Sequence, residues 1–358
     1  MAFHSPPPKM AVDLFMMISG YLMAANAFAR NSFEPLTSTR NWFRFWLRRF
    51  FRLAPAYYLS LAIAIVTSSY FLGGYQELQK LNPAKWPSGG IYDPVKIEYS
   101  LENVILHLSF LFGLFPSFSF STFLPDWSLS LEMQFYFVFP ALWILMSKFG
   151  FIRTALFIGL AAIIIGFGLS EFVHYSEPSF ILLKLQYFIA GILIFRTLSH
   201  SYNDRIRLAL GACAVFLVSL DYRYGSQLVV LPLLALSMII LGWCEAENRM
   251  PLWIRPLLNS RLTRFASDTS YGVYLFHGFF ISASGLILSS QPELLALPAY
   301  LRVALMFLFV STCAYMTAYA VFRWVELPGI SFGKSVIQRT LPTKTKQASS
   351  ALAVPERT

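Results

Sequence analysis

Charged residues are scarce in this chain: Asp, Glu, Lys and Arg together make up 13% of its 358 residues, whereas hydrophobic residues make up 56%. Soluble domains carry about 25% charged residues and about 45–50% apolar ones. The shortage of charge excludes an ordinary soluble domain. It predicts an all-α integral membrane protein, a polytopic bundle of transmembrane helices.

Cysteine is also rare, with Cys213, Cys244 and Cys313 as its three occurrences. All three lie in or at the ends of apolar segments, with no CxxC pair and no histidine at metal-ligand spacing. They predict small buried hydrophobic side chains, and neither a disulfide nor a metal site is expected. The start of the chain lacks the apolar core of a signal peptide, so the helices themselves are expected to direct insertion.

Long apolar runs are what the chain has instead, and each run of about 20 residues predicts a spanning helix. Nine such runs lie near residues 11–28, 53–73, 127–147, 151–171, 180–197, 207–221, 226–244, 272–290 and 300–322. A shorter run at 104–115, closed by Pro116, predicts a re-entrant or surface segment. We expect a transmembrane domain over residues 1–330 and a disordered cytoplasmic tail over 331–358.

The net charge of +10 is distributed unevenly between alternate loops. Loop 29–52 holds six arginines, whereas loop 74–126 holds three lysines against five acids. This alternation predicts that the basic face and the C-terminus are cytoplasmic, and it makes nucleic acid an unexpected partner. The first run would then enter from the outer side, so one further helix is expected to precede it.

The basic stretch from Asn41 to Leu61 contains arginines set among aromatic residues at the edge of an apolar run. On a helix, Arg48 and Arg52 are four residues apart and Arg49 and Arg52 are three apart, so their guanidinium groups converge on one face. Such a face binds phosphate well, and acyl-coenzyme A would suit it. The alternative is a topology signal made of snorkelling arginines.

A second set of polar residues follows Pro125. Ser128, Glu132 and Tyr136 are spaced by four and share one face of a predicted helix. Glu132 could accept a proton or bind a hydroxyl substrate, or it could pair with an arginine or tyrosine inside the bundle. The residues leave both interpretations open.

Other polar residues in apolar runs favour structural roles. Asp13 is expected to cap the helix that begins near it, and Ser19 with Gly20 to permit close helix packing. His277 is expected to satisfy a local hydrogen bond, with catalysis as the alternative. No functional signal comes from His107, His174 and His200, which lie in loops or short segments, nor from His4, which looks like part of a disordered end.

Five segments taken together resemble the acyltransferase 3 family of membrane O-acyltransferases. In family order they are VDLFMMISGYLM (12–23), RRFFRLAPAYYLSL (48–61), WSLSLEMQFYFVFP (127–140), SYGVYLFH (270–277) and VELP (325–328). The resemblance implies ten spanning helices with both termini cytoplasmic. Most of the family's first helix is then lacking, and the sequence is expected to begin at an internal methionine.

The resemblance also implies functional residues. His4 stands where the family has a histidine regarded as catalytic, although the basic residue that normally precedes it is absent. Arg49 and Arg52 match the family's Arg-x-x-Arg pair, so Arg48, Arg49 and Arg52 are expected to bind acyl-coenzyme A. Glu132 is the second expected catalytic residue. A possible substrate path comprises Ser128, Tyr136 and His277.

The activity implied is transfer of an acyl group, usually acetyl, from cytoplasmic acyl-coenzyme A to a hydroxyl of a saccharide or glycolipid. The acceptor would be lipopolysaccharide O-antigen, exopolysaccharide or another glycan at a bacterial inner membrane. Acetyl-coenzyme A would be a substrate, and no tightly bound cofactor is expected. Whether a separate extracytoplasmic acyltransferase completes the transfer is left open.

Two rival functions are compatible with the same residues. One is a transporter or flippase of a lipid-linked sugar or small molecule, with Glu132 and the arginines along its path. The other is an inactive remnant of an acyltransferase. The absence of repeated halves with broken helices favours the enzyme over the transporter.

Overall fold

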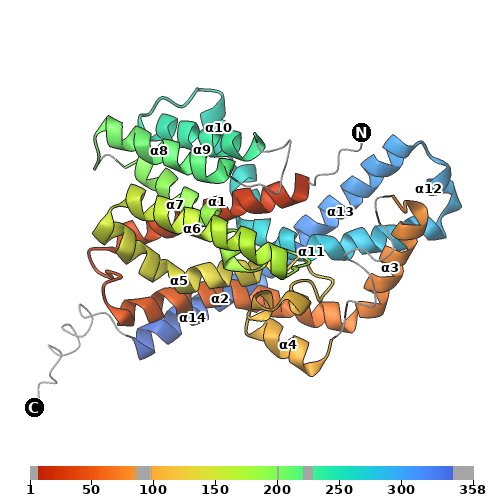
Figure 1. Ribbon diagram of the computed structural model, residues 1–358. Coiled ribbons are helices and arrows are strands. Elements are labelled where there is room, and N and C mark those ends of the chain that lie inside the picture. The colour runs from red at the N-terminus through yellow and green to blue at the C-terminus, as the bar shows by residue number, and fades with distance from the viewer. Residues whose placement is uncertain are drawn as a thin grey trace, which may run out of the picture. The chain divides into compact units, whose positions relative to one another are not determined.

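The computed structural model describes residues 7–84, 86, 97, 99–199, 201–220 and 229–341, and these form helices and no strand. The helices, labelled as in Figure 1, are α1 (Pro7–Arg30), α2 (Thr39–Val66), α3 (Ser68–Leu81), α4 (Leu101–Leu108), α5 (Trp127–Phe149), α6 (Phe151–Phe172), α7 (Leu185–Thr197), α8 (Asp204–Ser219), α9 (Val230–Ala246), α10 (Ile254–Leu258), α11 (Arg261–Ser290), α12 (Pro292–Ala296), α13 (Ala299–Val321) and α14 (Leu327–Thr340). Short 3-10 turns η2 (Phe112–Leu114), η3 (Pro116–Phe118) and η4 (Ile181–Leu183) and a π-helical turn η6 (Phe322–Glu326) complete them.

Six helical stretches are long and apolar enough to cross a membrane. They are Met10–Arg30 of α1, α2, α5, α6, α11 and the stretch Ala299–Thr340 that begins with α13. Two shorter helices, α7 and α9, are also apolar. Each of the nine predicted runs lies largely on a helix, so the prediction of an all-α, multi-pass membrane protein is confirmed.

The run predicted at 53–73 differs most from the observed helices. α2 already begins at Thr39, so it includes the arginine-rich stretch, and it ends at Val66. At Thr67 the side-chain Oγ1 donates to the Ile63 carbonyl oxygen at 2.7 Å. A hydroxyl bonded to the carbonyl four residues earlier competes with the helical pattern and bends the chain. The residues after this point form the separate helix α3.

One compact unit comprises residues 1–37, 95–122 and 126–265. Its central helix is α7, which is buried at all but one of its positions and packs along α1 (Figure 1). A Cβ atom added to Gly20 would lie 2.1 Å from the Phe188 carbonyl oxygen, and one added to Gly191 would lie 2.0 Å from the Met17 carbonyl oxygen. The prediction that Gly20 permits close helix packing is therefore confirmed.

The other compact unit comprises residues 38–94, 123–125 and 266–358. Here α14 packs against α2, with Gly329 facing Pro55 and Gly333 facing Phe51. The end of α14 is also fastened, since the Arg44 guanidinium donates to the Leu341 carbonyl oxygen at 2.6 and 2.8 Å.

Helix α14 changes the predicted boundary of the tail. Residues 331–340, which we expected to be disordered, are helical, and Gly333 and Ile337 among them are buried. The Phe332 ring also packs edge-on to Phe51, with 5.5 Å between ring centroids. Residues 342–358 lie outside the described part of the chain.

The run predicted as a short segment at 104–115 is not one helix. α4 ends at Leu108, and Phe110 takes a positive φ of 60° before the turns η2 and η3 begin. Positive φ is rare for a bulky residue and occurs where surrounding contacts enforce it. The segment therefore reaches α5 through irregular backbone.

Candidate active site

Glu132 lies inside the first unit, on the buried face of α5. Its side chain is 3% exposed, and its Oε1 accepts hydrogen bonds from the Tyr136 hydroxyl and, at 3.1 Å, from the Ser19 hydroxyl. Tyr136 is one turn further along α5, and Ser19 is on α1. The predicted pairing of Glu132 with a tyrosine inside the bundle is thus observed, and Ser19 is a partner that the sequence did not reveal.

Ser128, the third residue of the predicted face, is 2% exposed. Ser128, Glu132 and Tyr136 all lie on α5 at the predicted spacing of four residues, and all three are buried. The structure therefore brings together a carboxylate and hydroxyl groups at the junction of α5 and α1. This arrangement can hydrogen-bond a hydroxyl compound and can accept a proton from it.

A buried ion pair joins α1 to the residue before α7. The Lys184 Nζ lies 2.6 Å from Asp13 Oδ1 and 2.9 Å from Oδ2, and the two side chains are 2% and 0% exposed. Our prediction that Asp13 caps its helix is wrong, because α1 begins at Pro7 and Asp13 lies within it. A lysine inside the apolar run 180–197 was the available signal for this pair, since a buried charge requires a partner.

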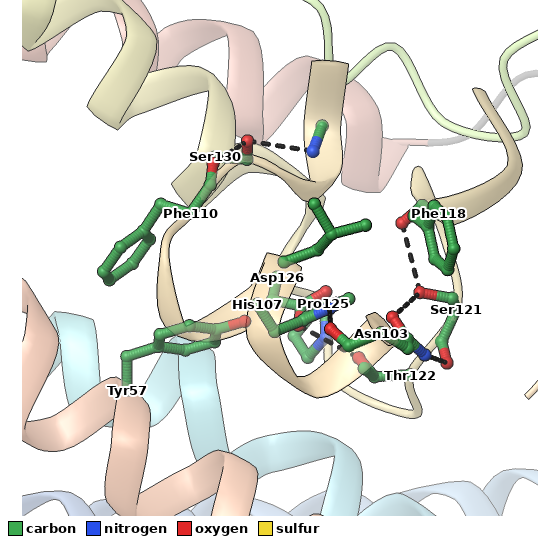
Figure 2. Close-up of polar contacts among 12 residues, drawn as sticks. Tyr57, Asn103, His107, Phe110, Phe118, Ser121, Thr122, Pro125, Asp126 and Ser130 are labelled. Atoms are coloured by element: carbon green, nitrogen blue, oxygen red, sulfur yellow. Dashed lines mark hydrogen bonds and ion pairs between the residues drawn. The ribbon is translucent and has the colours of Figure 1, made fainter. Parts of the chain in front are cut away.

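A polar network precedes α5 in the same unit, and Figure 2 shows its members. Asn103 Nδ2 donates to the Ser121 carbonyl oxygen at 3.2 Å, and Ser121 Oγ donates to Asn103 Oδ1 at 2.8 Å. Thr122 Oγ1 donates to Asp126 Oδ2 at 3.0 Å, and His107 Nε2 lies 3.5 Å from the same oxygen. His107 gave no signal in the sequence, yet it lies at the centre of this network.

Polar side chains also fasten two loops to α5. Ser130 Oγ donates to the Phe110 carbonyl oxygen at 2.6 Å and accepts from the Gly113 amide at 3.1 Å. Gln134 Nε2 donates to the Ser179 carbonyl oxygen at 2.9 Å, and its Oε1 accepts from the Ile181 amide at 3.0 Å. Side chains of α5 therefore hold the backbone of two segments, one around residues 110–113 and the other around residues 179–181.

The predicted donor-binding arginines belong to the second unit. Arg48 and Arg49 are half-buried on α2, and Arg52 is exposed. The Arg49 guanidinium lies over the Phe45 ring, 5.7 Å from its centroid. Arg52 interacts electrostatically with Glu326, the buried carboxylate of the VELP segment. Guanidinium groups on one helix face can bind phosphate oxygens.

His277 lies on α11 in this second unit, and its imidazole contacts backbone carbonyl oxygens of the same helix. Its Nδ1 is 2.8 Å from the Tyr274 carbonyl oxygen and 3.2 Å from that of Val273. The local hydrogen bond expected for His277 is therefore observed. His4, the other predicted catalytic histidine, lies outside the described residues.

The chain is similar to known acyltransferases over most of its length. A family model described as an acyltransferase domain matches residues 9–319. The chain is 23% identical over 348 residues to the peptidoglycan O-acetyltransferase OatA of Listeria monocytogenes, a match covering 88% of this chain and 50% of that protein. It is 34% identical over 127 residues to BcsY of Komagataeibacter xylinus, whose name provisionally describes a membrane-bound transacylase, covering 35% of this chain and 28% of that protein. The chain thus spans about half the length of the first relative and a smaller share of the second. No solved structure matches it significantly.

Proposed function

The chain belongs to the acyltransferase family whose domain matches residues 9–319, and on that premise we propose that it is a membrane O-acyltransferase acting on a saccharide. It moves an acyl group, chiefly acetyl, from acyl-coenzyme A to a hydroxyl of a cell-surface or exported polymer. The name of the first relative supports acetyl as the acyl group and a cell-wall saccharide as the class of acceptor.

The observation that carries this proposal is the environment of Glu132. Its carboxylate is buried in a membrane helix and accepts hydrogen bonds from two hydroxyl groups, those of Ser19 and Tyr136. Ionisable groups at this depth are costly and are associated with function. A carboxylate that already binds hydroxyl groups suits an acceptor hydroxyl, which Glu132 would orient or deprotonate.

The transfer itself balances without an added reagent. The acceptor oxygen bonds to the acyl carbon, the carbon–sulfur bond breaks, and the hydroxyl proton passes through a base to the departing thiolate. We assign the base, or a covalent acyl relay, to His4 on the family resemblance. Glu132 then acts on the acceptor.

Donor binding is assigned to Arg48, Arg49 and Arg52. The phosphates of coenzyme A carry several negative charges, and guanidinium groups three and four residues apart on α2 offer them bidentate hydrogen bonds. Arg52 is exposed and Arg49 is half-buried, so a donor that arrives from solvent can contact both guanidinium groups.

The proposed orientation follows from the distribution of charge. Basic residues in alternate loops support an orientation with the arginines of α2 and the C-terminus in the bacterial cytoplasm, where acyl-coenzyme A is made. The acyl group would then cross the inner membrane to an acceptor on the other side. A separate extracytoplasmic acyltransferase could complete the transfer.

The test is the O-acetyl content of surface glycans in a strain lacking the gene. We expect the content to fall on deletion and to return with the wild-type chain but not with Glu132→Gln, at equal amounts of membrane-inserted protein. A glycan whose acetylation is unchanged by the deletion would contradict the proposal. Loss of the glycan itself from the surface would favour the transporter.

A further inference from the structure

His107 and Asp126 form a buried pair at the start of α5 that the proposed transfer does not use. His107 is near the end of α4, and Asp126 is the residue before the first residue of α5. The His107 Nε2 and Asp126 Oδ2 are 3.5 Å apart, and both side chains are 1% exposed. The pair is visible among the contacts of Figure 2.

The contacts of the imidazole determine where its protons are. Nδ1 lies 2.9 Å from the Asn103 carbonyl oxygen, which can only accept, so Nδ1 carries a proton. Nε2 then faces the carboxylate. An unprotonated Nε2 would oppose its lone pair to that oxygen, so the arrangement requires a proton between the two atoms. A proton shared by Nε2 and Oδ2 holds the imidazole to the carboxylate.

Two further contacts hold the pair in place. Thr122 Oγ1 donates to the carboxylate oxygen Oδ2 at 3.0 Å. The Phe112 ring stacks on the imidazole, with 4.0 Å between centroids and 5° between planes, and so fixes the plane of the imidazole.

The same contacts exclude His107 as a general base. One ring nitrogen donates to a backbone carbonyl and the other faces Asp126, so neither can take a proton from a substrate. With 1% exposure, the side chain also has no access to one. Its effect on a reaction must therefore pass through the elements that it holds.

What the pair holds is the first turn of α5. The Asp126 side chain makes no capping bond to its helix, while its carbonyl oxygen accepts from the Leu129 amide at 2.8 Å. A second attachment lies one turn further on, where Ser130 Oγ bonds the Phe110 carbonyl oxygen at 2.6 Å. Phe110, whose carbonyl oxygen takes part in the second attachment, has a φ of 60°.

We propose that the His107–Asp126 pair is a positioning device that fixes the start of α5 and so the placement of Glu132 for acyl transfer. This inference rests on the proposed function. His107 and Asp126 are positioning residues, because they act through the helix that carries Glu132. A misplacement of about 1 Å in a catalytic group can lower a rate about a hundredfold.

The experiment uses the purified chain and four variants: His107→Gln, Asp126→Asn, the double variant, and the control His174→Gln in a loop. The single variant His107→Gln removes the imidazole that the buried Asp126 carboxyl group contacts. We expect it to lower kcat about tenfold or more, with the KM for acetyl-coenzyme A within about twofold. The double variant places two neutral amides that can bond each other, and we expect it to regain most of the lost kcat.

A second readout does not depend on activity. In protein labelled with 15N in the histidine rings, the signal absent from His107→Gln belongs to His107, and its Nε2 shift should change in Asp126→Asn. An Nε2 shift that Asp126→Asn leaves unchanged would overturn the pair. A kcat that falls only with the folded fraction, or a double variant no better than the singles, would overturn the positioning role. Wild-type protein without transfer would overturn the proposed function, while the 15N signal would still decide the state of the pair.

Discussion

Lys184 places its ammonium group between the two carboxylate oxygens of Asp13, at 2.6 and 2.9 Å, although the residues are 171 apart in the chain. The pair joins α1 to the start of α7, the same two helices that approach closely at Gly20 and Gly191. Because α1 also supplies the Ser19 hydroxyl to Glu132, whatever fixes α1 also fixes one side of the candidate site.

Lys184→Met leaves the Asp13 carboxylate buried without its cation. Breaking a buried ion pair in this way typically costs about 3–5 kcal/mol, so we expect a clear loss of thermal stability in detergent. The double variant Asp13→Leu with Lys184→Met removes both charges and should recover most of that loss. Lys148→Met, at an exposed position of α5, is the matched control. Equal melting temperatures for Lys184→Met and the control would contradict this account of the pair.

Gly20→Ala tests the contact between α1 and α7. The added methyl would lie 2.1 Å from a backbone oxygen of Phe188, which cannot move as a side-chain end can. We expect a destabilisation of about 1–3 kcal/mol, measured by thermal unfolding. Gly168→Ala in α6, where nothing lies within 4 Å of the added atom, should be neutral or slightly stabilising. Similar behaviour of the two variants would show that the helices are not in close contact.

Tyr136→Phe removes one of the two hydroxyl donors to Glu132 Oε1. A buried acceptor that loses a donor costs about 1–3 kcal/mol, and the carboxylate also loses a contact that orients it. We expect a lower kcat together with a modest fall in melting temperature. Tyr300→Phe, at a tyrosine that is 71% exposed, serves as the control. An unchanged kcat in Tyr136→Phe would show that the Tyr136 hydroxyl has no role in the reaction.

Arg49→Ala and Arg52→Ala should weaken the use of the acyl donor. Each removes a guanidinium group from the proposed phosphate-binding face, so we expect the KM for acetyl-coenzyme A to rise about tenfold with insertion unchanged. The matched control is Arg153→Ala, at an exposed arginine of α6. If less of each variant inserts into the membrane but the inserted molecules have a normal KM for acetyl-coenzyme A, the arginines are a topology signal alone.

The helices could be predicted because a membrane imposes long apolar runs, and each of the nine runs lies largely on a helix. Tertiary partners could not be found in the same way. Asp13 looked like a cap because Lys184, which binds it, is far away in sequence. His107 looked silent because its role depends on Asp126, which meets it only when the start of α5 lies against α4.

The tail boundary was misplaced for a related reason. The sequence after Gly333 is rich in small and polar residues, which favours disorder when the segment is considered alone. In the structure, Gly333 and Ile337 are buried and α14 packs on α2, so contacts with a distant helix override local composition. The predicted face of Ser128, Glu132 and Tyr136 was correct because helical spacing alone determines it.

The most direct measurement follows labelled acetyl from acetyl-coenzyme A in vesicles made from membranes of a strain that lacks the gene, with the purified chain added. We predict that label enters the saccharide fraction with the wild-type chain and does so at least about a hundredfold more slowly with Glu132→Ala. Lys148→Met should transfer label at the wild-type rate. A folded, inserted wild-type chain that leaves all label on coenzyme A, or a Glu132→Ala variant with undiminished transfer, would contradict the account.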